Sequence, residues 1–412
     1  MKSKLIFLVL AVSAGTAFAD IAILSPTNGE TVVQLRPAQR KFALESRAER
    51  EKYFDDAQAS KALRANGTKP RPVVCSWRGA STNAAVILRR LPDGRVFHAA
   101  VVSTNVLHLD SLEIGRDWQL TVTSAGESAE VRFRTEDLTP RLLTFNGTAN
   151  CRDLGGYRGL DGRRIRQGLV FRTEGLNSNA PVEYYSNGEI LALEKAGKLK
   201  KMGSAGRRLH ERLKMGKELD KRPSRNRLMK REKYAPGARR LSEAEIARLL
   251  ATYGIRSDID LRSDAECYGM NGSPLGASVT WFHHSYTPYA TTFDEKGLEA
   301  NRNVFRVFLD ERNYPIDFHC IGGADRTGTV AMLLEALLGV GEDDLWRDYL
   351  TTGFAGVVSD AEHKRRFAAT VVRLKGFPGD TLAEKAAAFF RTIGYSDKDI
   401  AFLREHLLEP LP

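Results

Sequence analysis

The sequence predicts two domains of different fold class, an antiparallel β-sandwich followed by an α/β domain. Up to about residue 140 the chain consists mainly of short β-rich runs separated by turn residues. Beyond that point, apolar runs of strand length alternate with helical patterns. A chain of 412 residues has room for both domains, because one domain takes roughly 150 residues.

The chain begins with the three parts of a secretory signal peptide. Lys2 and Lys4 give a positive start, residues 5–12 an apolar stretch, and residues 17–19 (AFA) a small-x-small cleavage site. We therefore expect residues 1–19 to be removed and the mature protein to be exported, either periplasmic or secreted. No later stretch approaches the roughly 20 apolar residues of a membrane-spanning helix, so no transmembrane helix is expected in the mature form.

The first domain is predicted over 20–140. Its expected strands lie at 71–77, 84–91, 96–102, 117–125 and 129–135. A helical pattern over 41–65 interrupts them and is interpreted as an insertion. The opening SPTNGETV, the CSW on a strand and the closing FRTEDLTPR resemble a fibronectin type III-like domain. A sandwich by itself indicates no chemistry.

The second domain is predicted over 141–412 as an α/β fold. Its expected strands lie at 169–173, 256–263, 279–285 and 315–320. Ser242 and Glu245 form a capping-box pattern before a helix that Gly254 ends. The stretch 329–340 is predicted as a helix with one apolar face.

A basic insertion is predicted over about 178–239 within this domain. Residues 195–240 contain 18 Lys and Arg against 4 Asp and Glu, so the net charge of +11 is concentrated there. We expect the insertion to be helical in part, over 207–219. Two interpretations stay open: the charges are solvated surface, or they attract an anionic substrate, polymer or lipid surface. No specific nucleic-acid motif accompanies them.

The segment FHCIGGADRTG at 318–328 carries the strongest indication of chemistry. It follows a predicted buried strand and leads into a helix, and such a turn directs backbone N–H groups towards an anion. Gly322 and Gly323 permit the tight backbone path. The expected anion-binding positions are Ile321, Gly322, Gly323, Ala324 and Gly328.

Four side chains of this segment have types suited to phosphoryl transfer. Cys320 would be a thiolate nucleophile, favoured by the helix N-terminus and by Arg326. Arg326 can offer a bidentate fork to two phosphoryl oxygens. Thr327 can donate its hydroxyl to the sulfur, and Asp325 can protonate the leaving oxygen. No metal or organic cofactor is expected, because arginine and the helix N-terminus supply the positive charge.

HCIGGADRTG resembles the signature of the cysteine-dependent phosphatases, and within them of a bacterial tyrosine and lipid phosphatase family whose loop typically reads HCxxGKDRTG. Further similar segments, in the family's order, are NCRDLGGY (150–157) with GRRIRQGLVFRT (162–173), GIRSDIDLRSDAE (254–266), DDLWRDYLTTGF (343–354) and GYSDKDIAFLREHLL (394–408). The resemblance implies that Cys320 is the nucleophile, Arg326 the phosphate-binding arginine and Asp325 the general acid. Asp294 is the reserve candidate for the acid.

The chain departs from the family at one loop position, where Ala324 stands in place of lysine. In the family that lysine is associated with acceptance of phosphoinositides, so its absence weakens a lipid-phosphatase interpretation. We expect an exported phosphomonoester hydrolase acting through a phosphocysteine intermediate, foremost a protein-tyrosine phosphatase. A phosphoinositide or inositol polyphosphate phosphatase is the enzymatic alternative. A pseudophosphatase that binds polyanions or a cell-surface partner is the non-enzymatic one.

The remaining polar candidates are interpreted mainly as structural. Arg152 with Asp153, and Asp260 with Arg262, are expected to form buried ion pairs. Neighbouring histidines 283 and 284 would face opposite sides of a strand, so they cannot share a metal. Cys151 and Cys267 each adjoin a motif of the family, and a disulfide between them is a hypothesis to test.

Overall fold

The structure is a computed structural model that describes residues 20–53, 67–79, 83–180, 183–226, 228, 230, 237–356 and 361–411. Its contacts divide the chain into two units. The N-terminal unit is Met1–Arg36 with Arg71–Asp137, and the C-terminal unit is Pro37–Pro70 with Leu138–Pro412. The predicted signal peptide, 1–19, lies outside the described residues and stays a prediction.

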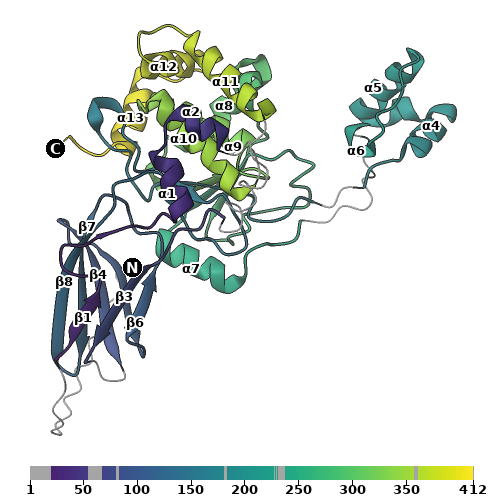
Figure 1. Cartoon of the computed structure of the whole chain (residues 1–412). Coiled ribbons are helices and arrows are strands. Elements are labelled where there is room, and N and C mark those ends of the chain that lie inside the picture. Colours follow the sequence, from purple (N-terminus) through teal and green to yellow (C-terminus); the bar gives the residue numbers. More distant parts are fainter. Residues whose placement is uncertain are drawn as a thin grey trace. The chain divides into compact units, whose positions relative to one another are not determined.

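The N-terminal unit contains two sheets (Figure 1). One has the strand order β1 (Ala22–Ser25), β3 (Val73–Arg78), β6 (Val106–Leu109). The other has the order β2 (Thr31–Val32), β8 (Glu127–Thr135), β7 (Asp117–Ser124), β4 (Ala84–Leu91), β5 (Val96–Val102). All neighbours pair antiparallel except β2 with β8.

One hydrophobic cluster joins the two sheets of this unit. Alternate residues of β4 and β7, such as Val86 and Leu120, point into it, as the period of two along a strand requires. Trp118 is completely buried there, and its Nε1 donates to Thr135 Oγ1 at 3.2 Å. The likeness to fibronectin type III stays a prediction.

The helical segment between β2 and β3 belongs by its contacts to the C-terminal unit. It was expected at 41–65 as an insertion in the sandwich. The structure has α1 (Pro37–Leu44) and α2 (Arg47–Lys52) there, and 54–66 lie outside the described residues. Phe42 of α1 is part of the large hydrophobic core of the C-terminal unit, which explains this assignment.

The C-terminal unit is built on one six-stranded sheet. The strand order is β13 (Thr280–His283), β12 (Ser257–Asp260), β14 (Ile316–His319), β11 (Val170–Thr173), β10 (Arg152–Asp153), β9 (Arg141–Leu142). The first four strands are parallel, and they are the four that the sequence predicts. β10 and β9 add an antiparallel edge.

Helices cover both faces of this sheet (Figure 1). α7 (Glu243–Tyr253) packs on one face with its own hydrophobic cluster. The other face is covered by α8 (Glu295–Val307), α9 (Asp325–Leu337), α10 (Glu342–Thr351), α11 (Ala361–Lys375), α12 (Leu382–Thr392) and α13 (Asp397–Leu407). Short 3₁₀ turns are η1 (Leu160–Gly162), η4 (Tyr289–Phe293), η5 (Glu311–Asn313) and η6 (Thr352–Ala355). An α/β fold is therefore confirmed for this unit.

Two details of the predicted helices were wrong. α9 does not have a single apolar face, because every residue from 327 to 337 is buried. The predicted capping box of α7 forms only in half. Ser242 caps the N–H of Glu245, but the Glu245 carboxylate accepts from the Asn146 N–H at 2.7 Å instead of turning back to the cap.

The basic insertion is helical where the structure describes it. It contains α4 (Asn187–Lys195), η2 (Leu199–Lys201), α5 (Gly203–Lys214) and α6 (Pro223–Asn226) around a small cluster of Ile190, Leu199, Leu209 and Leu228. Its two ends meet where the Ser178 N–H donates to Ala238 O at 2.8 Å. Between 195 and 226, twelve Lys and Arg side chains are exposed. None of the helices within the described ranges is both long and apolar enough to cross a bilayer.

Titratable side chains gather on one face of β12 and β14. The parallel register sets Asp258 beside Asp317 and Asp260 beside His319, and all four are buried. Burial opposes a charge on His319, but Asp260 and Asp258 raise the pKa of His319 to about 9. Burial raises the pKa of Asp317 to about 7, although Thr173 Oγ1 donates to its carboxylate at 3.0 Å.

Replacing Asp317 with asparagine is expected to flatten the pH dependence of stability. The folded pKa of about 7 exceeds the value of about 3.9 for an unfolded Asp, so the folded state binds the proton more tightly. This contribution to stability is complete below about pH 4 and is lost as the pH rises through 7. Between about pH 5 and 8, the unfolding free energy of the wild type should fall by on the order of 2 kcal/mol more than that of Asp317→Asn.

Denaturant unfolding at a series of pH values measures this difference. Asp264→Asn is the matched control, because the Asp264 side chain is 93% exposed and the same change there should leave a wild-type profile. Parallel profiles for wild type and Asp317→Asn would contradict the prediction.

Candidate functional site

The candidate site is the loop between β14 and α9, which we call the cysteine loop (residues 320–326). β14 ends at His319, Cys320 follows at once, and α9 begins at Asp325. Cys320 is 2% exposed. The nine predicted site positions, 320–328, thus lie on this loop and on the first turn of α9, at the carboxyl end of a central parallel strand.

Three consecutive carbonyl groups of the cysteine loop are bound by the segments beside it. Ile321 O accepts from the Gly175 N–H at 3.0 Å. Gly322 O accepts from Asn150 Nδ2 at 2.9 Å, and Gly323 O accepts from Arg172 Nη2 at 2.7 Å. Because the carbonyl oxygens are held from outside, the N–H groups of the same peptides are directed the other way.

Close backbone packing explains the loop glycine at 323. Gly323 has φ +63°, and a Cβ there would lie 2.3 Å from Thr173 O. Gly175 on the facing segment is similarly restricted, since a Cβ would come within 2.9 Å of Cys320 O. The predicted need for a tight path is met at Gly323, where both the dihedral angle and the space exclude a side chain.

The loop N–H groups are available to a ligand. Within the described residues, none of the N–H groups of 321–326 donates to a protein oxygen. They lie at the N-terminus of α9, a helix of 13 residues, where the helix dipole adds positive potential. The loop can therefore bind an anion of tetrahedral shape.

The Cys320 thiol is shifted towards its ionised form. Burial raises the pKa of Cys320, but Arg326 and Thr327 lower it, and the net result is a pKa below the usual value. Thr327 is completely buried, and its hydroxyl and its N–H both act as hydrogen-bond donors that favour the charged sulfur. A thiolate is the reactive form of cysteine.

Arg326 is held in place by a carboxylate that the sequence did not single out. Its Nη1 donates to Glu266 Oε2 at 2.7 Å and lies 3.4 Å from Leu261 O. Glu266 is itself fixed, because the N–H of Ser263 donates to it at 2.7 Å. No described residue accepts from Arg326 Nε, which leaves that edge of the guanidinium for a ligand.

Asp325 is contacted by aromatic and imidazole groups. Tyr289 Oη donates to Asp325 Oδ1 and pairs with Tyr349 Oη at 2.9 Å. His363 Nε2 of α11 lies 3.9 Å from the same Asp325 oxygen. The Asp325 side chain is 38% exposed, so it is accessible to a bound ester.

The reserve acid, Asp294, has a different setting. It is the N-cap residue of α8, is 61% exposed, and pairs with Arg373 of α11 at 3.6 Å. Asp325, by contrast, interacts electrostatically with Cys320. Of the two candidates for the acid, the contacts of the described residues therefore favour Asp325 over Asp294.

Buried charges below the loop support it. Asp348 of α10 binds both Arg152, at 2.6 Å from Nε, and Arg172. Burial raises the pKa of Asp348, but the two arginines outweigh it and lower the pKa. Burial lowers the pKa of Arg172 to about 10, which leaves it charged near neutral pH. The hydrogen bond from Arg172 to the Gly323 carbonyl is therefore made by a charged donor.

One of the two expected buried ion pairs is present, and the residues of the other pair bind different partners. Asp260 and Arg262 pair with each other at 2.7 Å. Arg152 and Asp153 do not pair together: Arg152 binds Asp348, and Asp153 binds Arg141 at 2.6 Å.

The disulfide hypothesis was wrong. All four cysteines are free and buried. Cys151 Sγ donates to Ala149 O at 3.2 Å, and Cys267 Sγ donates to Asp260 Oδ2 at 3.2 Å. Adjacency to motifs in the sequence therefore did not imply contact between these two sulfur atoms.

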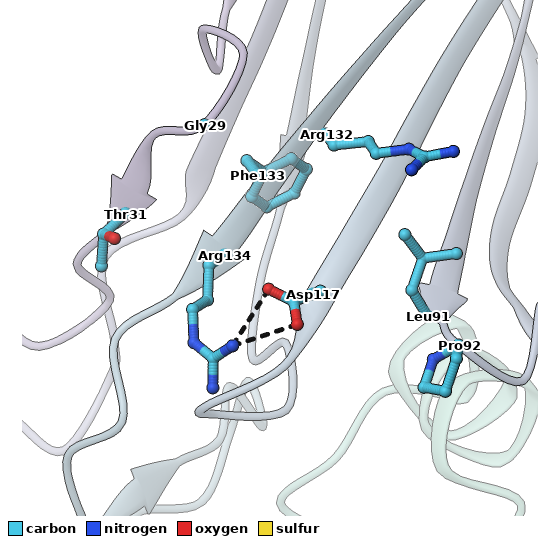
Figure 2. A pocket seen from close by; sticks show the side chains of 8 residues that line it. All are labelled: Gly29, Thr31, Leu91, Pro92, Asp117, Arg132, Phe133 and Arg134. Atoms are coloured by element: carbon cyan, nitrogen blue, oxygen red, sulfur yellow. Dashed lines mark hydrogen bonds and ion pairs between the residues drawn. The ribbon is translucent and has the colours of Figure 1, made fainter.

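A cavity lies on the N-terminal unit (Figure 2). Arg134 in it is neutralised by Asp117, with its Nη1 at 3.0 and 3.1 Å from the two carboxylate oxygens. The lining residues are Gly29, Thr31, Leu91, Pro92, Asp117, Arg132, Phe133 and Arg134. It contains no cysteine or histidine, so it does not compete with the cysteine loop as a centre of covalent chemistry.

The residues that support the cysteine loop were not predicted as part of the site. Asn150 and Arg172 do lie within segments that resemble the phosphatase family, 150–157 and 162–173, but the sequence assigns neither of them a role in the site. Glu266 and Tyr289 bear on the loop from 60 and 36 positions away along the chain, and no local pattern links them to it. Among the described residues no cluster of His, Cys, Asp and Glu has the geometry of a metal site.

Comparison with known proteins agrees with this geometry. The sequence model of the tyrosine phosphatase family matches residues 143–184 and 235–409, more than half of the chain. A protein of Cupriavidus necator named "Putative tyrosine-protein phosphatase H16_A0669" is 28% identical over 213 residues. This match covers 50% of the present chain and 62% of the relative, so the chain spans less than two thirds of that protein.

The family match includes the cysteine loop and every strand of the central sheet except β9, which begins two residues before it. It omits 185–234, the greater part of the basic insertion. The N-terminal unit lies outside it as well. On the match of 143–184 and 235–409, the chain belongs to the tyrosine phosphatase family.

Proposed function

We propose that the protein hydrolyses phosphomonoesters through a phosphocysteine intermediate, with phosphotyrosine in proteins as the foremost substrate. The observation that carries this is the combination at Cys320: a thiol with a lowered pKa lies beneath N–H groups that have no described acceptor. Family membership supports a phosphatase. A loop built only to bind an anion would gain nothing from a reactive thiolate.

In the first chemical step, Cys320 Sγ attacks phosphorus and the ester oxygen leaves. Asp325 gives its proton to that oxygen, which avoids release of an alkoxide or phenoxide. The step forms a sulfur–phosphorus bond and breaks the phosphorus–oxygen bond of the ester. The alcohol or phenol departs, and the phosphoryl group stays on Cys320.

In the second step, water attacks the phosphocysteine. The Asp325 carboxylate, now without its proton, accepts a proton from that water, and the sulfur–phosphorus bond breaks. Thr327 stabilises the departing thiolate through its hydroxyl. Inorganic phosphate leaves, and Cys320 and Asp325 are restored for the next cycle.

The positive charge that the transition state requires comes from the loop and from Arg326. The loop N–H groups bind the equatorial phosphoryl oxygens, and the free edge of Arg326 adds charge-assisted hydrogen bonds. Glu266 orients Arg326 so that little reorganisation is needed on binding. The proposal assigns substrate binding to 321–324 and 328 through their backbone.

A phosphoinositide or inositol polyphosphate is the second candidate substrate class. It is favoured by the twelve exposed Lys and Arg side chains between 195 and 226. Such a surface attracts multiply charged ligands through long-range electrostatics. Ala324 weighs against this class, since its side chain is 1% exposed and brings no charge to the loop. Export, inferred from the first 19 residues, is part of the same proposal.

Cys320→Ser is expected to abolish turnover of p-nitrophenyl phosphate, and Asp325→Asn to reduce it by about 100-fold or more. The loss in Asp325→Asn should be larger for phenyl phosphate, because phenol is a poorer leaving group and depends more on the acid. Steady-state hydrolysis of the two esters under reducing conditions measures these losses. The same assay is then applied to phosphotyrosine peptides, phosphoinositides and inositol polyphosphates.

Two variants serve as matched controls. Cys75→Ser makes the same change at a buried cysteine of the N-terminal unit, and Asp294→Asn makes it at the reserve acid. If Asp294→Asn rather than Asp325→Asn shows the dependence on the leaving group, the acid is Asp294. No turnover of any of these esters by folded, reduced protein would favour the polyanion-binding alternative.

The ionisation of Cys320 provides an independent test. Inactivation by iodoacetamide should rise with pH around a midpoint below the value of about 8.5 for an ordinary thiol, because Arg326 and Thr327 favour the thiolate. Arg326→Ala should move that midpoint upward. Arg312→Ala is the control, because Arg312 is 89% exposed and pairs with Asp310. A wild-type midpoint at or above that of a free thiol would refute the assignment of Cys320 as a poised nucleophile.

A further inference from the structure

The segment 37–70 lies in the sequence between two strands of the N-terminal unit, yet its contacts are with the phosphatase fold. The chain passes into the C-terminal unit after Arg36 and returns to the N-terminal unit at Arg71. Of this segment, 37–53 and 67–70 are described. The family match begins only at residue 143, so these residues are additional to the matched phosphatase region.

Helices α1 and α2 pack against α10 and η6. The Phe42 and Phe354 rings meet edge to face with 5.2 Å between centroids. Arg47 lies 4.3 Å above the Trp346 ring and pairs with Glu342 at 2.8 Å. These contacts involve a buried aromatic residue and a charged group that is only partly exposed, so the segment is an integral part of the packed fold.

The returning part of the segment, 67–70, reaches the support of the cysteine loop. Gln39 Nε2 of α1 donates to Gly67 O at 3.0 Å, which ties these residues to the helix. Thr68, 3% exposed, accepts a hydrogen bond at its Oγ1 from the Asn150 N–H at 3.0 Å. Asn150 in turn donates from Nδ2 to Gly322 O at 2.9 Å.

Asn150 needs this support because it is completely buried. Its φ is +57°, in the left-handed region, which Asn adopts more readily than most residues with a side chain. Its N–H would be an unpaired buried donor without Thr68 Oγ1. The hydroxyl therefore stabilises the backbone conformation from which the amide side chain reaches the loop.

We propose that residues 67–70, anchored on α1, are a positioning element of the cysteine loop, with Thr68 acting through Asn150 on the Gly322 carbonyl. The inference rests on the proposed function for the meaning of the loop, and it deepens that function by adding a positioning residue outside the matched region. When Asn150 loses its anchor, the Gly322 carbonyl is free to rotate. The following N–H, which belongs to Gly323, then turns away from the anion and from the Cys320 sulfur.

The test compares Thr68→Val with Thr68→Ser in the full chain. Valine has nearly the shape of threonine but no acceptor, whereas serine keeps the hydroxyl. In Thr68→Val the midpoint of Cys320 alkylation should rise by roughly half a pH unit or more. Protection of Cys320 by inorganic phosphate should weaken, and kcat/KM should fall about tenfold. Thr68→Ser should restore most of each property.

Thr370→Val is the matched control. Thr370 is also fully buried, and its hydroxyl donates to Arg366 O within α11 at 2.8 Å, so the same change removes a hydrogen bond elsewhere. A general loss of packing would affect both valine variants alike. Only Thr68→Val should shift the alkylation midpoint.

Three results would overturn the inference: wild-type alkylation and phosphate protection in Thr68→Val, equal impairment in Thr68→Val and Thr68→Ser, or the same shift in Thr370→Val. The alkylation and phosphate measurements do not need turnover. If the wild type hydrolyses no phosphoester while Thr68→Val still changes the alkylation midpoint and the phosphate protection of Cys320, the proposed function fails and the positioning role stands. If the wild type is active and Thr68→Val is indistinguishable from it, only the positioning role fails.

Discussion

The orientation of three peptide groups in the cysteine loop is the constraint on which the rest of the site depends. A loop of free peptides would present carbonyl oxygens and N–H groups alike to an anion, and the oxygens would repel it. Here the carbonyls of Ile321, Gly322 and Gly323 are occupied by Gly175, Asn150 and Arg172. The N–H groups are thereby left on the other side, at the start of a helix whose dipole has the same sign. The proposed binding of a phosphoryl group requires this arrangement.

Holding the loop in this way places charge in the interior of the protein. Arg152 and Arg172 are completely buried around Asp348, and such charges are tolerated only when they are paired and hydrogen-bonded. Glu335 beside them has a pKa raised well above its usual range, chiefly by burial and then by Asp348. Burial therefore disfavours the charged form of Glu335, whereas Asp348 is held charged between the two arginines. Arg172 of this cluster interacts electrostatically with Cys320, and its positive charge favours a thiolate and a bound anion.

Support of the loop comes from parts of the chain that lie far apart in sequence. Asn150 lies just before β10, Arg172 in β11 and Asp348 in α10, and Thr68 belongs to a segment that the sequence places between strands of another unit. The same principle applies to the side chains around the loop. Glu266 orients Arg326, and Tyr289 donates to Asp325. A reactive loop of a few residues is thus held by several separate regions, because a short loop cannot fix its own peptide orientations.

The sequence alone determined the α/β class of the C-terminal unit, its four parallel strands and the position of the loop. These features depend on local patterns: apolar runs of strand length, a helix start, and glycines beside a cysteine and an arginine. Only the tertiary structure decided which side chains hold the loop, that Cys151 and Cys267 are not bridged, and that Glu245 binds Asn146 rather than its own cap. It also decided that α1 and α2 pack with the phosphatase fold. Each of these depends on contacts between distant segments, and a local pattern records which residues can make a contact but not which partner the folded chain brings to them.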